Sequence, residues 1–551
     1  MFGAGGGTGS YEETEHTDLI VLWGSNAREA HPIFFHHVLK GVRNGARLIV
    51  IDPRRTSSAE WADLWLGLDV GSDIALSNTI AREIIANGLQ HRAFIDLATT
   101  GYETYDASVQ DWTLERGEAV TGVPAEIIRE VAHAYAKADR AVICWTLGIT
   151  EHHTAVDNVL ALINLGLLTG HVGRYGSGLN PLRGQNNVQG GGDMGAIPNK
   201  LPGFQDIEKD AAAREKFERA WGVPIVPRYG WHLTAMFQAM ERGDLTAVYC
   251  IGENPATSEA DNQHATHLLQ NLDTLIVQDL FMTRTAEIAD VVLPASNAAF
   301  EAEGTVTNSE RRVQRVRKAL EPPGQAEDDM WIIAQLAKRL GFDWGELAAR
   351  QAWDELRSLS PMHAGMSWER LEELGGIQWP CPDEDHPGTK FLHARLWEED
   401  PESQGPKAPF SVVVDDPPVD QLNEEYPFRL TTGRRLDSFN TGVQTVGYTS
   451  PLRHKETLDI SPEDAERLEL VEGETVCVSS RRGSIEAPVH VAPELRPGLV
   501  FMTFHFPDEV ETNVLTIEAT DPKSGTAEFK ATAVRIEKVA EPAAVTGGGG
   551  G

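Results

Sequence analysis

A glycine- and amide-rich segment, PLRGQNNVQGGGDMG, contains the side chains best suited to bind a small polar ligand. It spans residues 181–195 and combines one arginine, Arg183, with four side-chain amides in the five positions from Gln185 to Gln189. Glycine and asparagine are also common in ordinary loops, because both tolerate a positive φ. Four neighbouring amides, however, offer many neutral donors and acceptors, and a few convergent polar groups are what orient a bound ligand. We interpret the segment as a ligand-binding loop.

The elements that must position this loop include two βαβ units of the same design. In each unit a buried apolar strand leads into a turn that starts with glycine, and a second strand ends at an aspartate. The turns and acids are Gly24-Ser25-Asn26 with Asp52, and Gly252-Glu253-Asn254 with Asp279. The expected strands are residues 18–23 and 47–51 in the first unit, and residues 247–251 and 274–278 in the second.

The second strands of the two units can be aligned directly. Residues 48–66 (LIVIDPRRTSSAEWADLWL) and residues 275–293 (LIVQDLFMTRTAEIADVVL) are identical at 10 of 19 positions without a gap. Chance is a poor explanation for that agreement. The fold class is therefore expected to be α/β, with two related, doubly wound halves.

The position of the turns and acids predicts nucleotide binding. In doubly wound sheets a ligand lies beyond the carboxyl ends of the strands, where the first turn meets a phosphate and the acid meets a ribose or base. Neither turn has the GxGxxG spacing, so this is not an ordinary nicotinamide or flavin site. Alternatively, each acid merely caps the next helix. Repetition in register favours two nucleotide sites that face each other, and hence a two-headed nucleotide ligand.

The rest of the chain divides into segments with different patterns of apolar and turn-forming residues. A further strand is expected over residues 141–147, just before Gly148, and a helix over residues 155–169. From residue 428 the pattern changes to short alternating strands separated by turns, which is typical of a β-barrel. We predict a first α/β domain at 1–185, a second at 186–300, a peripheral helical and irregular segment at 301–425, a barrel at 426–540 and a flexible tail at 541–551.

Composition excludes several classes of function. The net charge of −34 argues against nucleic-acid binding through a basic face. No apolar run reaches the length of a membrane span, and no signal peptide is evident, so a cytoplasmic location is expected, with an export signal further upstream as the alternative. The four cysteines lie far apart without CxxC spacing, which argues against an iron–sulfur or zinc site built from them.

Several motifs together resemble the catalytic alpha subunit of molybdenum or tungsten formate dehydrogenases, in the molybdopterin oxidoreductase superfamily. The resemblance covers essentially the whole chain, and its motifs are GSNAREAHP (24–32), IDPRRT (51–56), LRGQNNVQGGGDMG (182–195), GENP (252–255), QDLFMTRTAEIADVVLP (278–294), GGIQWPCP (375–382) and TTGRRLDSFNTG (431–442). It implies a bis-molybdopterin guanine dinucleotide cofactor around one metal, which agrees with the two-headed ligand. It also implies a barrel of the double-psi type.

By motif, Arg183 resembles the arginine that holds the substrate carboxylate in that family. A planar guanidinium can pair with formate through two parallel hydrogen bonds. The alternative is a structural salt bridge from Arg183 to Asp193. The resemblance implies no metal ligand in this sequence, and it implies cofactor contacts from Gly24, Ser25, Asn26, Glu29, Asp52, Arg54, Asp73, Gly148 and Gln185, from Gly252, Asn254, Gln278, Asp279 and Thr283, and from Gly433, Arg434, Asn513 and Lys530.

Two departures from the family concern its N-terminal part. The family carries a four-cysteine segment for a 4Fe-4S cluster, and a cysteine or selenocysteine metal ligand next to a histidine. Both would precede the loop FGAGGGTG (residues 2–9), with which this sequence opens. We therefore expect an incomplete N-terminus, upstream DNA that encodes both features, and a chain that is inactive by itself.

The resemblance implies oxidation of formate to carbon dioxide, with electrons passed to an iron–sulfur or flavin NADH-type partner subunit. Two alternatives stay open at this stage. One is another molybdopterin oxidoreductase of the nitrate reductase type, which the arginine in the amide loop disfavours. The other is a non-catalytic protein that binds the cofactor as a carrier or assembly scaffold.

Overall fold

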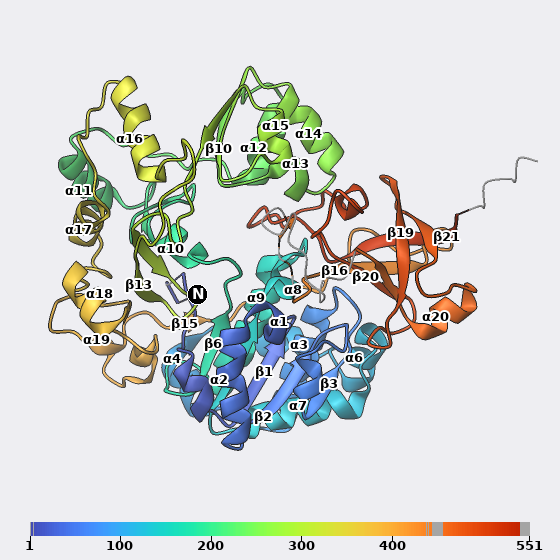
Figure 1. Cartoon of the computed structure of the whole chain (residues 1–551). Helices are drawn as coiled ribbons and strands as arrows, with labels where there is room; N and C mark the ends of the chain where they lie inside the picture. Colours follow the sequence, from blue (N-terminus) through green and yellow to red (C-terminus); the bar gives the residue numbers. More distant parts are fainter. Residues whose placement is uncertain (1, 4, 437, 439, 443–455, 540–551) are drawn as a thin grey trace, which may run out of the picture.

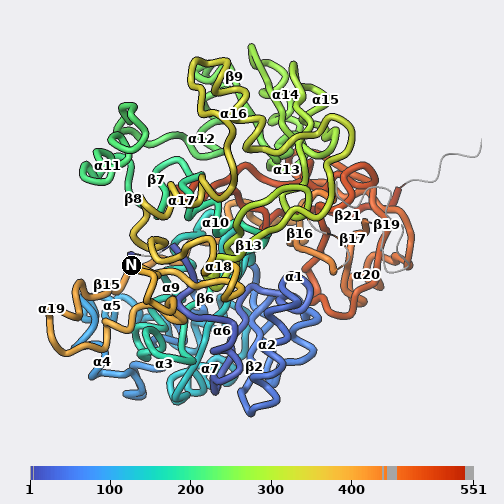
Figure 2. The backbone as a smooth tube through the Cα atoms, turned by 60° about the vertical axis from the view of Figure 1, so that its left-hand side comes forward, coloured from blue at the N-terminus to red at the C-terminus, as the bar shows by residue number. Residues whose placement is uncertain are grey.

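The computed structural model describes residues 2–3, 5–436, 438, 440–442 and 456–539. Figure 1 shows the first α/β domain at the bottom, the second at the top, the barrel at the right and the peripheral helices at the left. Turned by 60°, the tube in Figure 2 shows the first domain at the bottom, the second at the top and the barrel at the right, with the peripheral strand β13 near the centre. The predicted tail at 541–551 lies outside the described residues.

The first domain contains a five-stranded parallel sheet with the order β3-β2-β1-β5-β6. Because β1 lies inside the sheet and later strands add on both sides of it, the fold is doubly wound and changes direction between β1 and β5. The strands are β1 (Leu19–Trp23), β2 (Arg47–Ile51), β3 (Leu64–Leu66), β5 (Ala141–Trp145) and β6 (Gly178–Pro181).

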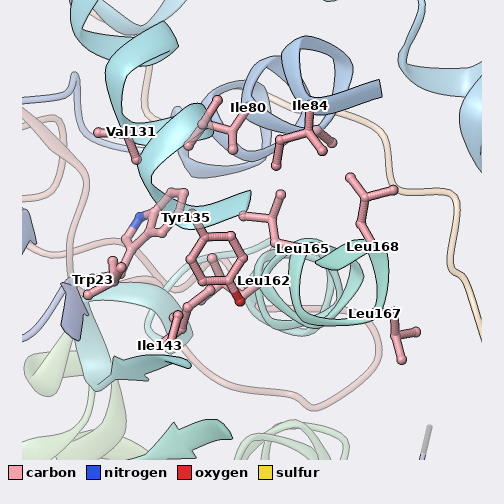
Figure 3. Packing of buried hydrophobic residues seen from close by; sticks show 14 of the residues in the cluster. Trp23, Ile80, Ile84, Val131, Tyr135, Ile143, Leu162, Leu165, Leu167 and Leu168 are labelled. Carbon is pink, nitrogen blue, oxygen red and sulfur yellow. The ribbon is translucent and has the colours of Figure 1, made fainter. Parts of the chain in front are cut away.

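Helices cover both faces of this sheet, because alternate residues of its strands enter two different apolar clusters. One face packs against α3 (Asp73–Ala86), α7 (Ala125–Lys137) and α9 (Ala155–Thr169), and Figure 3 shows this packing around Trp23. The other face packs against α2 (Pro32–Arg43). Burial on both faces explains why the strands read as continuous apolar runs.

The strand expected over residues 141–147 is shorter in the structure. It ends at Trp145, and residues 147–150 form the short helix α8 (Leu147–Thr150), which contains Gly148. Between them, Thr146 is extended and its hydroxyl donates to the carbonyl of Gly24 at 2.7 Å. This contact draws the chain across the end of β1 and stops the strand.

The second domain has a three-stranded parallel sheet with the order β11-β10-β9. Its hydrogen bonds repeat those of the first domain: Gly24 N–H donates to Ile51 O, and Gly252 N–H to Gln278 O, both at 2.8 Å. The predicted internal duplication is therefore present at the level of single bonds. The elements are β9 (Ala247–Ile251), β10 (Thr274–Asp279) and β11 (Val291–Pro294), with α12 (Leu233–Glu241), α13 (Pro255–Ser258), α14 (Asn262–Gln270) and α15 (Arg284–Glu287) beside them (Figure 1).

The C-terminal strands form a closed barrel with the order β16-β20-β17-β19-β18-β21, as the sequence predicted. The β16–β20 and β17–β19 pairs are parallel and the others antiparallel, which excludes a simple meander and fits the double-psi prediction. The strands are β16 (Phe428–Thr432), β17 (Leu458–Ile460), β18 (Thr475–Ser479), β19 (Ser484–Val491), β20 (Leu499–Met502) and β21 (Thr532–Lys538).

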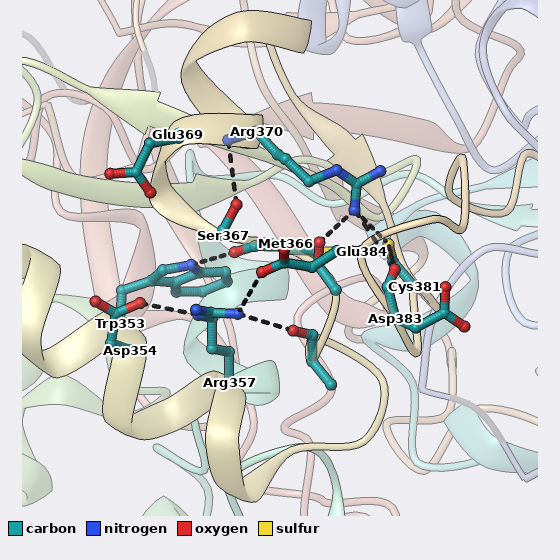
Figure 4. Close-up of polar contacts among 12 residues, drawn as sticks. Trp353, Asp354, Arg357, Met366, Ser367, Glu369, Arg370, Cys381, Asp383 and Glu384 are labelled. Atoms are coloured by element: carbon teal, nitrogen blue, oxygen red, sulfur yellow. Dashed lines mark hydrogen bonds and ion pairs between the residues drawn. The ribbon is translucent and has the colours of Figure 1, made fainter.

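The peripheral segment has its own core. Strands β12 (Gly304–Thr307), β13 (Arg312–Val316) and β14 (Ile377–Gln378) form an antiparallel sheet next to α17 (Ala349–Leu359) and α18 (Trp368–Leu374). Several tryptophans fill the space between them. Figure 4 shows the polar contacts that close this core, including the indole of Trp353, which donates to the carbonyl of Met366 at 2.7 Å.

A buried arginine joins this segment to the N-terminal glycine loop. The side chain of Arg311 is fully buried, and among the described residues it donates to backbone carbonyls alone: Nε to Gly7 at 2.7 Å, Nη1 to Thr389 at 3.0 Å and Nη2 to Lys390 at 2.7 Å. A buried cation is tolerated only when its donors are paired. Arg311 therefore fixes the path of residues 5–9.

Asp420 ties the end of the peripheral segment to the barrel. It is 3% exposed, and its Oδ2 accepts hydrogen bonds from Arg482 Nη2 at 2.6 Å and from Ala533 N–H at 2.9 Å. Asp420→Asn should lower the free energy of unfolding by about 2–3 kcal/mol, because the new amide presents a donor where an acceptor is required. Urea unfolding followed by circular dichroism measures this.

The matched control is Asp385→Asn, at an exposed position. It should change stability by less than about 0.5 kcal/mol. Equal stability of the two variants would show that Asp420 does not anchor the barrel.

Candidate functional site

The first glycine turn lies in direct contact with helix α8. Gly24 has a φ of 57°, and a Cβ added to Gly148 would lie 2.5 Å from the carbonyl oxygen of Gly24. Side chains are excluded at this contact, so the backbones of the glycine turn and of α8 can approach each other closely at the end of β1. Next to it, the Ser25 hydroxyl is buried and has no hydrogen-bond partner among the described residues. An orphaned donor beside a glycine turn fits a phosphate or another polar ligand group.

The two aspartates close equivalent turns. Asp52 Oδ1 accepts from Arg54 N–H at 3.0 Å, and Asp279 Oδ1 accepts from Phe281 N–H at 3.1 Å. Each acid caps the turn after its own strand, so the capping alternative explains one oxygen of each carboxylate. Within the described residues the Asp52 carboxylate makes no further hydrogen bond. Burial raises the pKa of both acids, which suits a carboxylate that waits for ligand donors.

The asparagines that end the two turns are also equivalent. Asn26 Oδ1 accepts from the hydroxyl of Ser58 at 2.8 Å, and Asn254 Oδ1 accepts from the hydroxyl of Thr285 at 2.8 Å. These bonds hold each glycine turn against the loop after the second strand. Glu29 also braces this loop, since it accepts from the Ser57 hydroxyl at 2.6 Å. The site of each half is therefore built from the same pair of loops.

Asp73 extends the first site. It is the first residue of α3, it is 6% exposed, and its Oδ1 accepts from the indole of Trp23 at 2.8 Å. Burial raises its pKa, and the nearby His152 opposes that shift. A second buried acid close to Asp52 favours a ligand that brings several donors.

The barrel supplies the outer wall of the first site. The guanidinium of Arg54 lies over the ring of Phe501, 3.6 Å from its centroid, and a Cβ on Gly433 would lie 2.9 Å from the same ring. Arg434 Nη1 donates to the carbonyl of Ala30 at 3.3 Å. Lys530 is 9% exposed and forms an ion pair with Glu151 at 2.6 Å, so it is not the surface lysine that composition alone would favour.

Other predicted contacts have protein partners that occupy them. Gln278 is fully buried and bonds to Tyr249 and Asp329. Thr283 caps α15, since its hydroxyl accepts from Ala286 N–H at 3.1 Å. Asn513 donates to Thr257 O at 2.9 Å. Gln185 is exposed and donates to Asn440 at 3.3 Å.

Arg183 is held from several sides. Its backbone N–H donates to the Ser309 hydroxyl at 2.9 Å, and its carbonyl lies 2.7 Å from His31 Nε2. On the side chain, Nε donates to Gln189 Oε1 and Nη2 donates to Gly5 O, both at 3.0 Å. Nη1 has no hydrogen-bond partner in the part of the chain that the structure describes. One edge of the guanidinium is therefore fixed, and the other is left for a ligand.

The alternative of an Arg183–Asp193 salt bridge is not realised. No ion pair within 4.0 Å joins them in the described residues, because Gln189 lies between, with its Nε2 2.9 Å from Asp193 Oδ1. Burial lowers the pKa of Arg183, and the Asp193 carboxylate opposes that shift. An intermediate exposure leaves the guanidinium accessible to a small anion.

Sequence reasoning missed three residues of this site. His31 and Gln189 lie inside the recognised motifs, where a histidine next to proline and a fourth amide were visible. Phe501 has no local signal, because only the barrel closure brings β20 against Arg54.

Within the described residues, no group of three or more histidine, cysteine or acidic side chains is placed to hold a metal ion, and no helix has the length and apolarity to span a membrane. The acids, glycine turns and free guanidinium together fit a polar dinucleotide with a small anion beside it.

Comparison with protein families assigns the chain. Residues 6–339 match the family described as Molybdopterin oxidoreductase, and residues 428–533 match the Molydopterin dinucleotide binding domain. The chain belongs to the molybdopterin oxidoreductase family, as the sequence motifs predicted, and it carries a molybdopterin dinucleotide-binding domain.

Two relatives cover nearly the whole chain. The F420-dependent formate dehydrogenase 2 subunit alpha of Methanococcus maripaludis is 42% identical over 98% of this chain and 79% of its own length. Formate dehydrogenase H of Escherichia coli is 37% identical over 98% of this chain and 75% of its own length. Among solved structures, acetylene hydratase from Pelobacter acetylenicus matches with a TM-score of 0.73 at 21% identity, over 97% of this chain and 79% of that one, which shows a shared fold.

The contact between Gly24 and Gly148 gives a direct test of the first site. Gly148→Ala should push the glycine turn away from α8, since its Cβ would lie 2.7 Å from Gly24 Cα. An overpacked contact of this kind costs about 1–3 kcal/mol, so we expect roughly tenfold weaker retention of the dinucleotide. The measurement is the nucleotide content of the purified protein after gel filtration.

Gly304→Ala is the control, because nothing lies within 4 Å of its added Cβ. It should leave nucleotide content unchanged. Full retention in Gly148→Ala would remove this contact from the binding site.

Proposed function

We propose that this chain is the catalytic subunit of a formate dehydrogenase, which oxidises formate to carbon dioxide at a molybdenum or tungsten centre. The observation that carries the proposal is the free edge of the Arg183 guanidinium, in a loop held by Ser309, His31 and Gln189. The proposal is supported by relatives at 37–42% identity, which are named as formate dehydrogenases.

The cofactor in this proposal is a bis-molybdopterin guanine dinucleotide. We assign one nucleotide to the first α/β domain (1–185), at Gly24, Ser25, Asn26, Asp52 and Asp73, and the other to the second domain (186–300), at Gly252, Asn254 and Asp279. The paired hydrogen bonds of Asp52 and Asp279 support this assignment. When bound, this cofactor would supply the two-electron acceptor that the oxidation of formate requires.

The task of Arg183 is orientation. Two parallel hydrogen bonds from a guanidinium to a carboxylate fix both its position and its plane, and so the direction of the formate C–H bond. Since Nε and one Nη2 hydrogen are already bonded to the protein, the Nη1 edge is the part that formate would meet. Gln189, which accepts from the bonded side, is 2% exposed, so little water competes for that bond.

The electrons must leave through another redox group, and we assign that role to a 4Fe-4S cluster N-terminal to the described chain and to an iron–sulfur or flavin partner subunit. The alpha-subunit names of the archaeal relatives support a multi-subunit enzyme. The fold by itself does not select the reaction, since a hydratase shares it.

The two-nucleotide proposal predicts a stoichiometry. Acid extraction of the cofactor-loaded protein should release about two guanine nucleotides per metal atom, one for each α/β half. Asp52→Ala and Asp279→Ala should each weaken cofactor retention, because the ligand donors left unpaired cost ~1–3 kcal/mol. Chromatography of the extract measures the guanine nucleotide, and metal analysis measures the metal. Together they give the ratio in the native protein and the cofactor retained by each variant. A single guanine nucleotide per metal, or a nicotinamide or flavin, would contradict the proposal.

Arg183→Lys tests the substrate. Lysine keeps the charge but cannot form the two parallel hydrogen bonds to the carboxylate. The rate of formate oxidation should therefore fall by about 100-fold or more, as expected when reacting groups are misplaced by ~1 Å. The assay is formate-dependent dye reduction by the assembled holoenzyme, with metal content measured alongside.

Arg219→Lys, at a side chain that is 72% exposed, is the matched control and should keep full activity. Near-normal formate turnover in Arg183→Lys would make Arg183 a structural residue. Turnover of nitrate in place of formate by the native enzyme would favour the nitrate reductase type of function, and cofactor binding without turnover would favour a carrier.

A further inference from the structure

A buried polar chain continues from Arg183 into the interior. Arg183 Nε donates to Gln189 Oε1 at 3.0 Å, and Gln189 Nε2 donates to Asp193 Oδ1 at 2.9 Å and to Gly5 O at 3.0 Å. Helix α10 (Val188–Asp193) places Gln189 and Asp193 four residues apart, on one face. They are 2% and 0% exposed, so water does not compete for these bonds.

The second oxygen of Asp193 is also occupied. Its Oδ2 accepts from the indole N–H of Trp379 at 2.8 Å, and the fully buried His363 places Nε2 3.8 Å away, beyond hydrogen-bond distance. Trp379 is 1% exposed and packs in the tryptophan-rich core of the peripheral segment. The indole is therefore a fixed donor. Asp193 meets a donor on each side and must accept from both.

This arrangement forces the orientation of the Gln189 amide. Arginine can only donate, and an ionised carboxylate can only accept. Gln189 must therefore point Oε1 at Arg183 and Nε2 at Asp193, and no other orientation pairs all the groups. The same orientation lets Nε2 reach the Gly5 carbonyl, which also accepts from Arg183 Nη2 at 3.0 Å.

We propose that Asp193 is a positioning residue for the substrate arginine: it orients the amide of Gln189, and Gln189 in turn fixes the guanidinium of Arg183. Asp193 touches neither substrate nor cofactor in this scheme. The inference deepens the proposed function, on which its kinetic consequence rests. Its structural consequence, the orientation of Arg183, stands independently of the reaction.

The isosteric variant Asp193→Asn separates hydrogen bonding from shape. Asparagine offers one acceptor to two donors, the amide of Gln189 and the indole of Trp379. Because packing fixes the indole, the Asn oxygen should face Trp379 and its NH₂ group should face Gln189. The Gln189 amide then turns by about 180° and presents Nε2 to Arg183 Nε, donor against donor. Arg183 must move away.

Removing the competing indole should reverse the defect. In the double variant Asp193→Asn/Trp379→Phe, the Asn oxygen is free to accept from Gln189, and its NH₂ group can turn to His363 Nε2 across the 3.8 Å gap. Gln189 then recovers its native orientation. If Asp193 had a merely structural role, deletion of a second buried group would not restore function, because the destabilising effects of two core substitutions normally add.

The experiment compares the native holoenzyme with Asp193→Asn, Trp379→Phe and the double variant. We expect the formate KM of Asp193→Asn to rise by about tenfold or more, with a smaller fall in kcat, because a displaced guanidinium loses one of its two hydrogen bonds to the carboxylate. Trp379→Phe and the double variant should stay within about threefold of the native KM. Crystal structures of all four should show Arg183 displaced only in Asp193→Asn.

The control is Asp464→Asn, at a buried aspartate of the barrel that is 2% exposed. It should lower Tm without changing the formate KM. If Asp193→Asn does not accumulate, Gln189→Met, which removes the same link, should raise KM by a similar factor.

An unchanged KM and an unmoved Arg183 in Asp193→Asn, or a double variant worse than either single one, would overturn the positioning role. Native holoenzyme that does not oxidise formate would overturn the proposed function instead, and the crystal structures would still decide how Arg183 is oriented.

Discussion

Parallel strands that lie side by side deliver their following loops to the same edge of a sheet, and the rest of this molecule depends on that constraint. In both α/β halves it brings a glycine turn and an aspartate together, with the same bonds in each: Gly24 with Ile51 and Gly252 with Gln278. The barrel contacts both edges: the Phe501 ring lies against Arg54 beside the first, and Asn513 donates to the carbonyl of Thr257 beside the second.

The sequence predicted the duplicated turns and those strands and helices whose limits depend on local residue patterns. Strand and helix limits in the first half agree with the structure within about two residues, because both faces of the sheet are buried and the apolar runs are unbroken. The alignment of residues 48–66 with residues 275–293 predicted equivalent turns, which the structure contains. The strand end at Trp145 was not predictable, since it depends on the contact of Thr146 with Gly24.

The site residues also divide into those that local motifs predict and those that only tertiary packing brings to the site. Gly24, Asp52 and Arg183 were visible in motifs, because their chemistry shows in the residue type. The neighbours that orient them were not visible, since Phe501 and Trp379 reach the site only through tertiary packing. The order of bonds from Trp379 to Arg183 cannot be read from spacing, because it crosses from the peripheral core to the loop between the domains.

The hydrogen bond from Arg311 to Gly7 joins residues 304 positions apart, and that from Arg183 to Gly5 spans 178. Contacts between residues so far apart in the sequence form late in folding, because the entropy cost of closing large loops must be overcome first. We therefore expect each sheet to assemble while residues 5–9 still lie away from Arg183. During that interval Arg183 Nη2 lacks the Gly5 carbonyl, so the orientation of the guanidinium is among the last features of the fold to be set.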